Sequence, residues 1–227
     1  MAFYFCGVNN VTSLSYAKGN SWGEAWQNRL FRSIIIVAVI LFVTQLFFLP
    51  SFFASIEKRD GIIMNDWLLQ IIPARDFSAV IFIIIWSACL LVIIRSIQQP
   101  EIFLIVIVSL VLLITVRMIT IYLVALDPPD GLIKLKDPLT SLTYGGKGIF
   151  MTKDLFFSGH TSNLFMFYLC LQKRGDKLFA LLGCIIVAVL VLVQHVHYSI
   201  DVIAAFIITW FLVKGVKKLI SHYIPSV

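Results

Sequence analysis

The chain has 227 residues, of which 60% are hydrophobic and only 13% are charged, and its formal net charge is +6. Soluble domains carry about a quarter charged residues, so this composition excludes an ordinary soluble protein and favours an integral membrane protein. In such a protein the positive balance indicates cytoplasmic lysines and arginines, and we expect no nucleic-acid partner.

Residues 1–29 are predicted to form a cytoplasmic or interfacial segment before the first apolar run. The stretch "SWGE", residues 21–24, has the pattern of a capping box, with Ser21 as the N-cap and Glu24 three positions later. This pattern predicts a short helix at the membrane surface.

Long apolar runs follow, and a spanning helix needs about 20 such residues. The first four predicted spans are residues 30–49, 77–94, 102–126 and 155–171, and Pro50 ends the first of them. The run 178–213 would be about 54 Å long as one helix, whereas the hydrocarbon core is about 30 Å thick. It must therefore contain two spans, which meet at the polar cluster 195–201. The predicted fold class is an all-α polytopic membrane protein, a six-transmembrane-helix bundle over residues 30–213.

Two connections between these spans are also predicted to be structured. Residues 59–78 are expected to form an interfacial helix that contains Trp67 and is bounded by Pro73. The segment 127–154 is long for a loop, and loops of that length are usually functional or disordered, so we interpret it as a lid over the site.

Charge predicts the orientation of the bundle. The basic residues on the side that holds both termini are Lys18, Arg29, Arg32, Arg95, Lys173, Arg174, Lys177, Lys214, Lys217 and Lys218. Those on the other side are Lys58, Arg59, Arg75, Lys134, Lys136, Lys147 and Lys153, and most of the acidic residues are also on that side. The positive-inside rule then places both termini in the cytoplasm, including a basic tail over residues 214–227.

Four ionisable residues fall at the edges of the later spans. His160 begins the fourth span, His195 and His197 end the fifth, and Asp201 starts the sixth. The predicted topology places all four on the same, non-cytoplasmic face. Ionisable groups inside spans are costly and indicate a functional site.

Helical spacing selects a pair among them. His197 and Asp201 are four residues apart, and on a helix they would share a face. A carboxylate fixes the tautomer of an imidazole and makes it more basic, as a nucleophile or general base requires. His160 would be the general acid, and the backbone of Ser158 and Gly159 at a helix N-terminus would favour a phosphate. This arrangement suits phosphoryl transfer through a phosphohistidine.

The main chemical alternative is a zinc site formed by His160, His195, His197 and Asp201. No His-Glu-x-x-His pair is present, and the four cysteines are far apart along the chain. We therefore expect no metal and no other cofactor.

The motifs resemble those of a known family. "SGHT", residues 158–161, and "HYSID", residues 197–201, are similar to the two catalytic motifs of the sphingomyelin synthase branch of the type 2 phosphatidic acid phosphatase superfamily. "RMITIY", residues 117–122, resembles a further motif of that branch. Asp154 and His195 also stand where the branch has an aspartate and a second histidine.

The resemblance implies a mechanism and a set of site residues. His197 would attack a lipid phosphate with support from Asp201, and His160 would assist the departing diacylglycerol oxygen. The head group of phosphatidylcholine or phosphatidylethanolamine would pass to ceramide or a similar lipid alcohol. The residues expected to bind substrate or phosphate are Ser158, Gly159, Arg117, Tyr122, Asp154, His195 and Lys153.

The chain lacks basic residues that the wider superfamily has in its motifs. No Lys-x6-Arg-Pro motif occurs, and Val191 stands where the superfamily has an arginine six residues before the nucleophilic histidine. The loss argues against an ordinary lipid phosphatase. Arg117 is the expected replacement, with Lys147 or Lys153 as further cations, although Arg117 is equally suited to a structural ion pair.

Three functions stay open from the sequence. The first is a sphingomyelin synthase-like head-group transferase, and the second is a phosphatase or phospholipase C-type hydrolase that uses water as the acceptor. The third is a non-catalytic membrane protein such as a channel or scaffold. The expected partners are the lipid bilayer, a glycerophospholipid donor and a ceramide-like acceptor, and an oligomer is compatible with the sequence.

Overall fold

The computed structural model describes residues 21–135 and 151–223, and this part of the chain is a helical bundle. Its helices are α1 (Trp22–Gln27), α2 (Arg29–Glu57), α3 (Trp67–Ile71), α4 (Ser78–Gln98), α5 (Pro100–Leu123), α7 (Gly159–Cys170), α8 (Arg174–Val193) and α9 (Ser199–Tyr223). The predicted helical class is confirmed. Residues 136–150, with Lys136, Lys147 and most of the predicted lid, lie outside the described residues.

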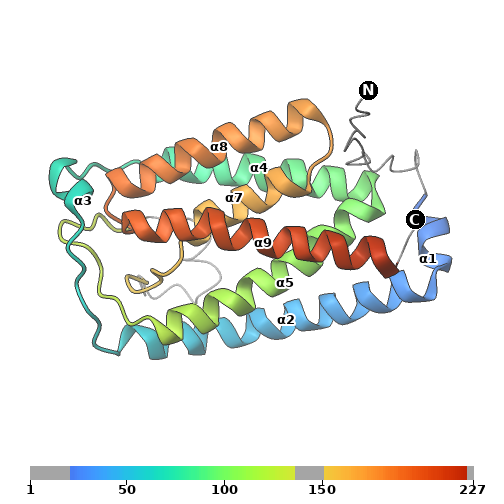
Figure 1. The fold of residues 1–227 in the computed structure, drawn as a ribbon, viewed down its shortest axis with the longest axis horizontal. Coiled ribbons are helices and arrows are strands. Elements are labelled where there is room, and N and C mark those ends of the chain that lie inside the picture. Colours follow the sequence, from blue (N-terminus) through green and yellow to red (C-terminus); the bar gives the residue numbers. More distant parts are fainter. Residues whose placement is uncertain (1–20, 136–150, 224–227) are drawn as a thin grey trace, which may run out of the picture.

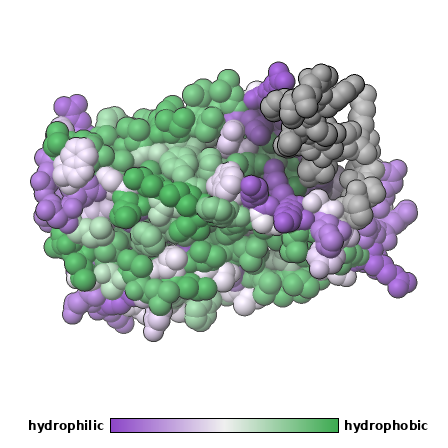
Figure 2. Space-filling model, in the orientation of Figure 1, coloured by the Kyte–Doolittle hydropathy of each residue, from purple (hydrophilic) through white to green (hydrophobic). Residues whose placement is uncertain are grey.

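Five helices, α2, α4, α5, α8 and α9, are long and apolar enough to cross a membrane. They fit the predicted integral membrane protein. The run 178–213 is indeed divided, because α8 ends at Val193 and α9 begins at Ser199. Figure 2 shows the corresponding surface, which is apolar along the middle of the bundle and hydrophilic at both of its ends.

Two predicted helix boundaries are wrong. Pro50 lies inside α2, which continues to Glu57 because Phe53 and Ile56 are buried against Ile121 of α5. Of the predicted interfacial helix 59–78, only the five residues of α3 and Ser78, the first residue of α4, are helical in the structure.

The predicted fourth span is a helix of 12 residues, α7, preceded by the non-helical residues 151–158. Such a helix is about 18 Å long, well short of the hydrocarbon thickness of about 30 Å. A short connection joins the end of α7 to the start of α8, and α8 itself has 20 residues. Since α8 is about 12 Å longer than α7, α7 begins part-way along the bundle rather than at its edge.

The bundle has two distinct ends (Figure 1). The α1 end contains Trp22–Gln27, the start of α2 and the end of α9, whereas the α3 end contains Trp67–Ile71, the end of α8 and the start of α9. Helix α7 contacts α4, α5, α8 and α9. Its Thr161, Leu164 and Met166 have no exposed surface, so α7 is the core of the bundle.

Polar contacts join the helices at the α1 end. Ser21 and Glu24 form the predicted capping box of α1. Arg95 of α4 makes a bidentate ion pair with Asp176 of α8, with Nε–Oδ2 and Nη2–Oδ1 distances of 2.6 and 3.1 Å. Lys217 of α9 donates from Nζ to the carbonyl oxygen of Leu169, at 2.5 Å, near the C-terminus of α7. A cation there is favourable because helix C-termini carry partial negative charge.

Gln194 joins three segments at the α3 end. Its fully buried side chain donates from Nε2 to Ser78 Oγ at 2.8 Å and to the Ile133 carbonyl at 3.2 Å. Its Oε1 accepts the Phe77 N–H at 3.1 Å. The turn between α8 and α9 is thereby attached to the start of α4 and to the segment that follows α5.

Replacing Gln194 with leucine removes these hydrogen bonds at nearly constant volume. Each buried polar group left without a partner costs about 1–3 kcal/mol, so we expect Gln194→Leu to lower the midpoint of thermal unfolding in detergent clearly. Gln27→Leu, at the exposed end of α1, is the matched control and should leave the midpoint unchanged. Equal midpoints for both variants would show that the buried amide does not hold this end together.

Candidate active site

His197 and Asp201 meet at the start of α9. The distance between His197 Nδ1 and Asp201 Oδ2 is 3.4 Å, and the two side chains are 2% and 0% exposed. The helical spacing predicted for this pair is wrong, because α9 begins at Ser199 and His197 lies in the preceding turn. The contact forms instead because Asp201, in the first turn of α9, lies beside the turn that precedes the helix.

Asp201 connects the two sequence motifs. Its Oδ2 accepts the N–H of Tyr198 at 3.0 Å, which orders the turn that carries His197. Its backbone carbonyl accepts the N–H of Ser158 at 3.1 Å. One residue of α9 therefore holds both the turn before its own helix and the residue that precedes α7.

His160 lies opposite His197 in the first turn of α7. The centroids of the two imidazole rings are 6.3 Å apart. Ser158 is the N-cap, and its Oγ accepts the N–H of Thr161 at 3.4 Å. A serine at the N-cap explains locally why the helix begins where it does. The first-turn amides of α7 therefore start beside both histidines.

Several polar atoms of this cluster have no hydrogen-bond partner within the described part of the chain. They are Nδ1 of His160, Nδ1 of His197 and Oδ1 of Asp201, and all three are buried. The 3.4 Å contact of His197 with Asp201 is thus close enough for an ion pair but is not aligned as a hydrogen bond. Buried polar atoms normally find partners, so the occurrence of three unpartnered atoms in one cluster marks it as the candidate active site.

Arg117 of α5 lies against the start of α7. Its Nη2 pairs with Asp154 Oδ1 at 2.6 Å, and its Nε donates to the Phe157 carbonyl at 3.0 Å. A Cβ atom placed on Gly159 would be only 2.5 Å from Arg117 Nη1. Glycine at this position therefore allows a guanidinium to lie directly against the backbone beside His160.

The other predicted binding residues are in different surroundings. Lys153 Nζ pairs with Asp127 Oδ1 at 2.7 Å and also donates to the Arg59 carbonyl. The Tyr122 side chain is 68% exposed on the outside of the bundle, so the structure does not bring it to the histidines. The binding roles of Lys153 and Tyr122 stay predictions.

His195 is held by backbone. Its Nδ1 is 2.8 Å from the Asp130 carbonyl oxygen and its Nε2 is 2.9 Å from that of Ile72. Its φ angle is 54°, a left-handed conformation that is uncommon outside glycine. Both ring nitrogens face carbonyl oxygens and not the other two histidines, so the four-residue zinc set considered from the sequence is not assembled. His195 links the α8–α9 turn to two neighbouring segments.

Asp66 is a residue that the sequence reasoning missed. Its Oδ2 accepts the N–H of Ser199 at 2.7 Å, and its Oδ1 accepts the N–H of Leu68 at 3.0 Å. One carboxylate thus caps the N-termini of both α3 and α9. Burial opposes ionisation of this carboxyl group, but the hydrogen bonds from Ser199 and Leu68 outweigh it and hold the pKa of Asp66 below its usual range. The only sequence signal was an aspartate directly before Trp67.

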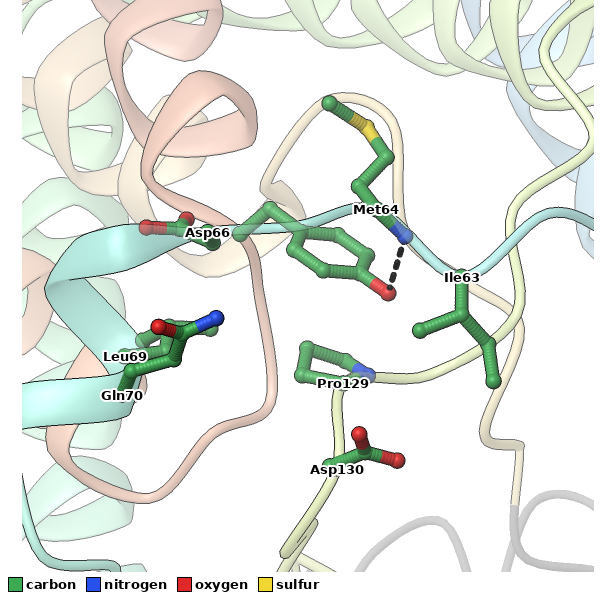
Figure 3. A pocket seen from close by; sticks show the side chains of 8 residues that line it. Ile63, Met64, Asp66, Leu69, Gln70, Pro129 and Asp130 are labelled. Atoms are coloured by element: carbon green, nitrogen blue, oxygen red, sulfur yellow. Dashed lines mark hydrogen bonds between the residues drawn. The ribbon is translucent and has the colours of Figure 1, made fainter.

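A small pocket lies at the α3 end, beside this cap (Figure 3). It has a volume of about 100 Å³, and its lining residues are Ile63, Met64, Asp66, Leu69, Gln70, Pro129, Asp130 and Tyr198. Tyr198 O–H donates to the Asp127 carbonyl at 2.8 Å and accepts the Met64 N–H at 3.1 Å. The tyrosine after His197 is therefore a buried support for this end of the bundle.

Comparison with protein-family models matches residues 152–218 to the PAP2 superfamily C-terminal family. This segment contains both the "SGHT" and the "HYSID" motifs. The match supports membership of the PAP2 superfamily. It therefore suggests a lipid enzyme of the phosphatase or phosphotransferase type, in agreement with the apolar helices. No curated protein matches the chain.

A side chain at Gly159 should displace Arg117. We expect Gly159→Ala to lower the thermal midpoint, because crowding of this kind costs about 1–3 kcal/mol and the guanidinium is already held by two partners. Gly215→Ala in α9 is the control, since a Cβ there meets nothing within 4 Å.

The same clash predicts non-additivity. The double variant Gly159→Ala/Arg117→Ala should be more stable than the sum of the two single losses predicts, since the second change removes the clashing group. Strict additivity in thermal unfolding would show that the two residues do not crowd each other.

Proposed function

We propose that the protein is a membrane phosphotransferase of the sphingomyelin synthase-like branch. It moves the phospho-head group of a glycerophospholipid, phosphatidylcholine or phosphatidylethanolamine, to ceramide or a similar lipid alcohol. The observation that carries the proposal is the pair formed by His160 and the buried His197, with ring centroids 6.3 Å apart and the Asp201 carboxylate 3.4 Å from His197.

In the first step Nε2 of His197, the ring nitrogen that does not face Asp201, attacks the donor phosphorus. A P–N bond forms, and the P–O bond to diacylglycerol breaks. Asp201, on the Nδ1 side, supports the positive charge that develops on the imidazole. His160 donates a proton to the departing diacylglycerol oxygen, as a general acid facing the nucleophile does.

In the second step an alcohol of the acceptor lipid attacks the phosphohistidine. His160, now without its proton, accepts the proton of that hydroxyl group, the P–N bond breaks and a P–O bond to the acceptor forms. The N-terminus of α7 and the Arg117 guanidinium favour the anionic phosphoryl group throughout. Arg117 thereby takes the place of the superfamily arginine that Val191 replaces.

The same proposal includes six membrane crossings. α2 begins and α9 ends at the same end of the bundle, which requires an even number of crossings (Figure 1). Five helices are long enough to span, so α7 together with residues 151–158 would make the sixth crossing. The positive-inside rule then favours cytoplasmic termini and a site that opens on the non-cytoplasmic face.

The test uses purified protein in detergent or vesicles with head-group-labelled phosphatidylcholine or phosphatidylethanolamine. We expect a labelled sphingophospholipid that forms only with ceramide present. Label released to water at the same rate without ceramide would instead identify the hydrolase. No consumption of either donor would contradict both enzymes and leave the non-catalytic alternative.

Substitution at the two histidines tests the mechanism. His197→Ala and His160→Ala should each lower the transfer rate by about 1,000-fold or more, because each removes a reacting group. When the His160→Ala protein is incubated with labelled donor alone, it should still become labelled. This label should survive alkaline denaturation and be lost in acid, because a P–N bond is stable in alkali and breaks in acid. His222→Ala, exposed near the end of α9, is the matched control. Normal transfer by His197→Ala would exclude the phosphohistidine.

A further inference from the structure

Glu57, the last residue of α2, binds the segment that leads to the site. Its Oε2 accepts the N–H of Thr152 at 3.1 Å and that of Lys153 at 3.2 Å, and its Oε1 accepts the Thr152 hydroxyl. No sequence pattern indicates this role, because Glu57 is 95 positions before Thr152 and 96 before Lys153. One half-buried carboxylate therefore fixes two successive residues of backbone.

Arg59, two residues further on, binds the other element of the site. Its Nη1 and Nη2 donate to the carbonyls of Tyr122 and Ile121, each at 2.6 Å. These carbonyls lie in the last turn of α5, the helix that carries Arg117. The Arg59 carbonyl also accepts a hydrogen bond from Lys153 Nζ.

The two attachments converge on the Arg117–Asp154 ion pair. Asp154 directly follows the residues that Glu57 holds, and Arg117 lies on the helix whose end Arg59 holds. Between these attachments, Thr120 Oγ1 donates to the Phe156 carbonyl at 3.1 Å, and Arg117 Nε donates to that of Phe157. The end of α2 and the residues just after it therefore hold both the segment that contains Asp154 and the helix that contains Arg117.

We propose that Glu57 is a positioning residue for head-group transfer, acting through Asp154 on the Arg117 guanidinium. Carboxylates that accept backbone N–H groups make strong, charge-assisted hydrogen bonds, so Glu57 restricts where residues 152–154 can lie. Asp154 then has a fixed location from which it holds Arg117 against Gly159. The inference rests on the proposed function, since Arg117 matters there as the cation beside the phosphoryl group.

Kinetics of Glu57 variants provide the first test. We expect Glu57→Ala to lower kcat about 10- to 100-fold with little change in KM for the donor, because a small misplacement of a catalytic group has effects of this size. Glu57→Gln keeps an oxygen that accepts N–H groups and should recover most of the rate. Glu24→Ala, which removes a capping carboxylate at the opposite end, should match the wild type. An unchanged kcat for Glu57→Ala overturns the proposal.

A double-variant comparison tests whether Glu57 acts through Asp154. If it does, Glu57→Ala/Asp154→Asn should be no slower than Asp154→Asn alone, since the second change has already released Arg117. Losses in kcat that multiply in the double variant would mean that Glu57 acts by another route, which overturns the proposal.

Amide hydrogen exchange tests the attachment without any enzyme assay. Glu57→Ala should speed exchange at Thr152 and Lys153, and Glu24→Ala should not. If the wild-type protein transfers no head group to ceramide or to water, the proposed function fails, while exchange still decides whether Glu57 holds this segment. Unchanged exchange at both amides overturns the inference even in an active enzyme.

Discussion

The structure depends on one constraint, that a polar group inside an apolar bundle has no water to bind and must find a partner in the protein. The α3 end meets this constraint in detail. Gln194 has three partners, both ring nitrogens of His195 face carbonyl oxygens, and Asp66 caps two helices. Buried atoms without a partner also occur at other described residues, such as Ser109 and Thr209, but those of His160, His197 and Asp201 belong to three neighbouring side chains.

Helix α7 is both the packed core of the bundle and part of the candidate site, and its two ends favour partners of opposite charge. Its N-terminus lies beside the Arg117 guanidinium and both histidines, an environment that favours an anion. Its C-terminus is bound by the Lys217 ammonium group. The helix is buried by four other helices, so neither end can shift without disturbing the core. The geometry on which the proposed phosphoryl transfer depends is therefore part of the packing of the bundle.

Much of this arrangement could be predicted from the sequence. Lipid thickness alone divided the run 178–213, and the "SGHT" and "HYSID" motifs indicated residues that the fold brings together. The prediction that His197 and Asp201 share a face of one helix was wrong, because Asp66 caps α9 and this helix begins only after His197. Contacts between distant residues, such as those of Glu57 and Gln194, left no pattern in the sequence, since a single polar residue at a helix end has many equivalent explanations. The continuation of α2 through Pro50 depended on packing against α5, which local propensity does not report.

The short length of α7 has a consequence for the membrane itself. This helix starts about 12 Å short of the end of α8, so under the proposed function a phosphate bound at its first turn would lie beneath the plane of the surrounding headgroups. A lipid in that position has to sink relative to its neighbours, and its tails must bend aside or press toward the other leaflet. Thin or loosely packed bilayers would lower the free-energy cost of moving the lipid to that depth. The affinity of the proposed site for its lipid would therefore depend on bilayer thickness.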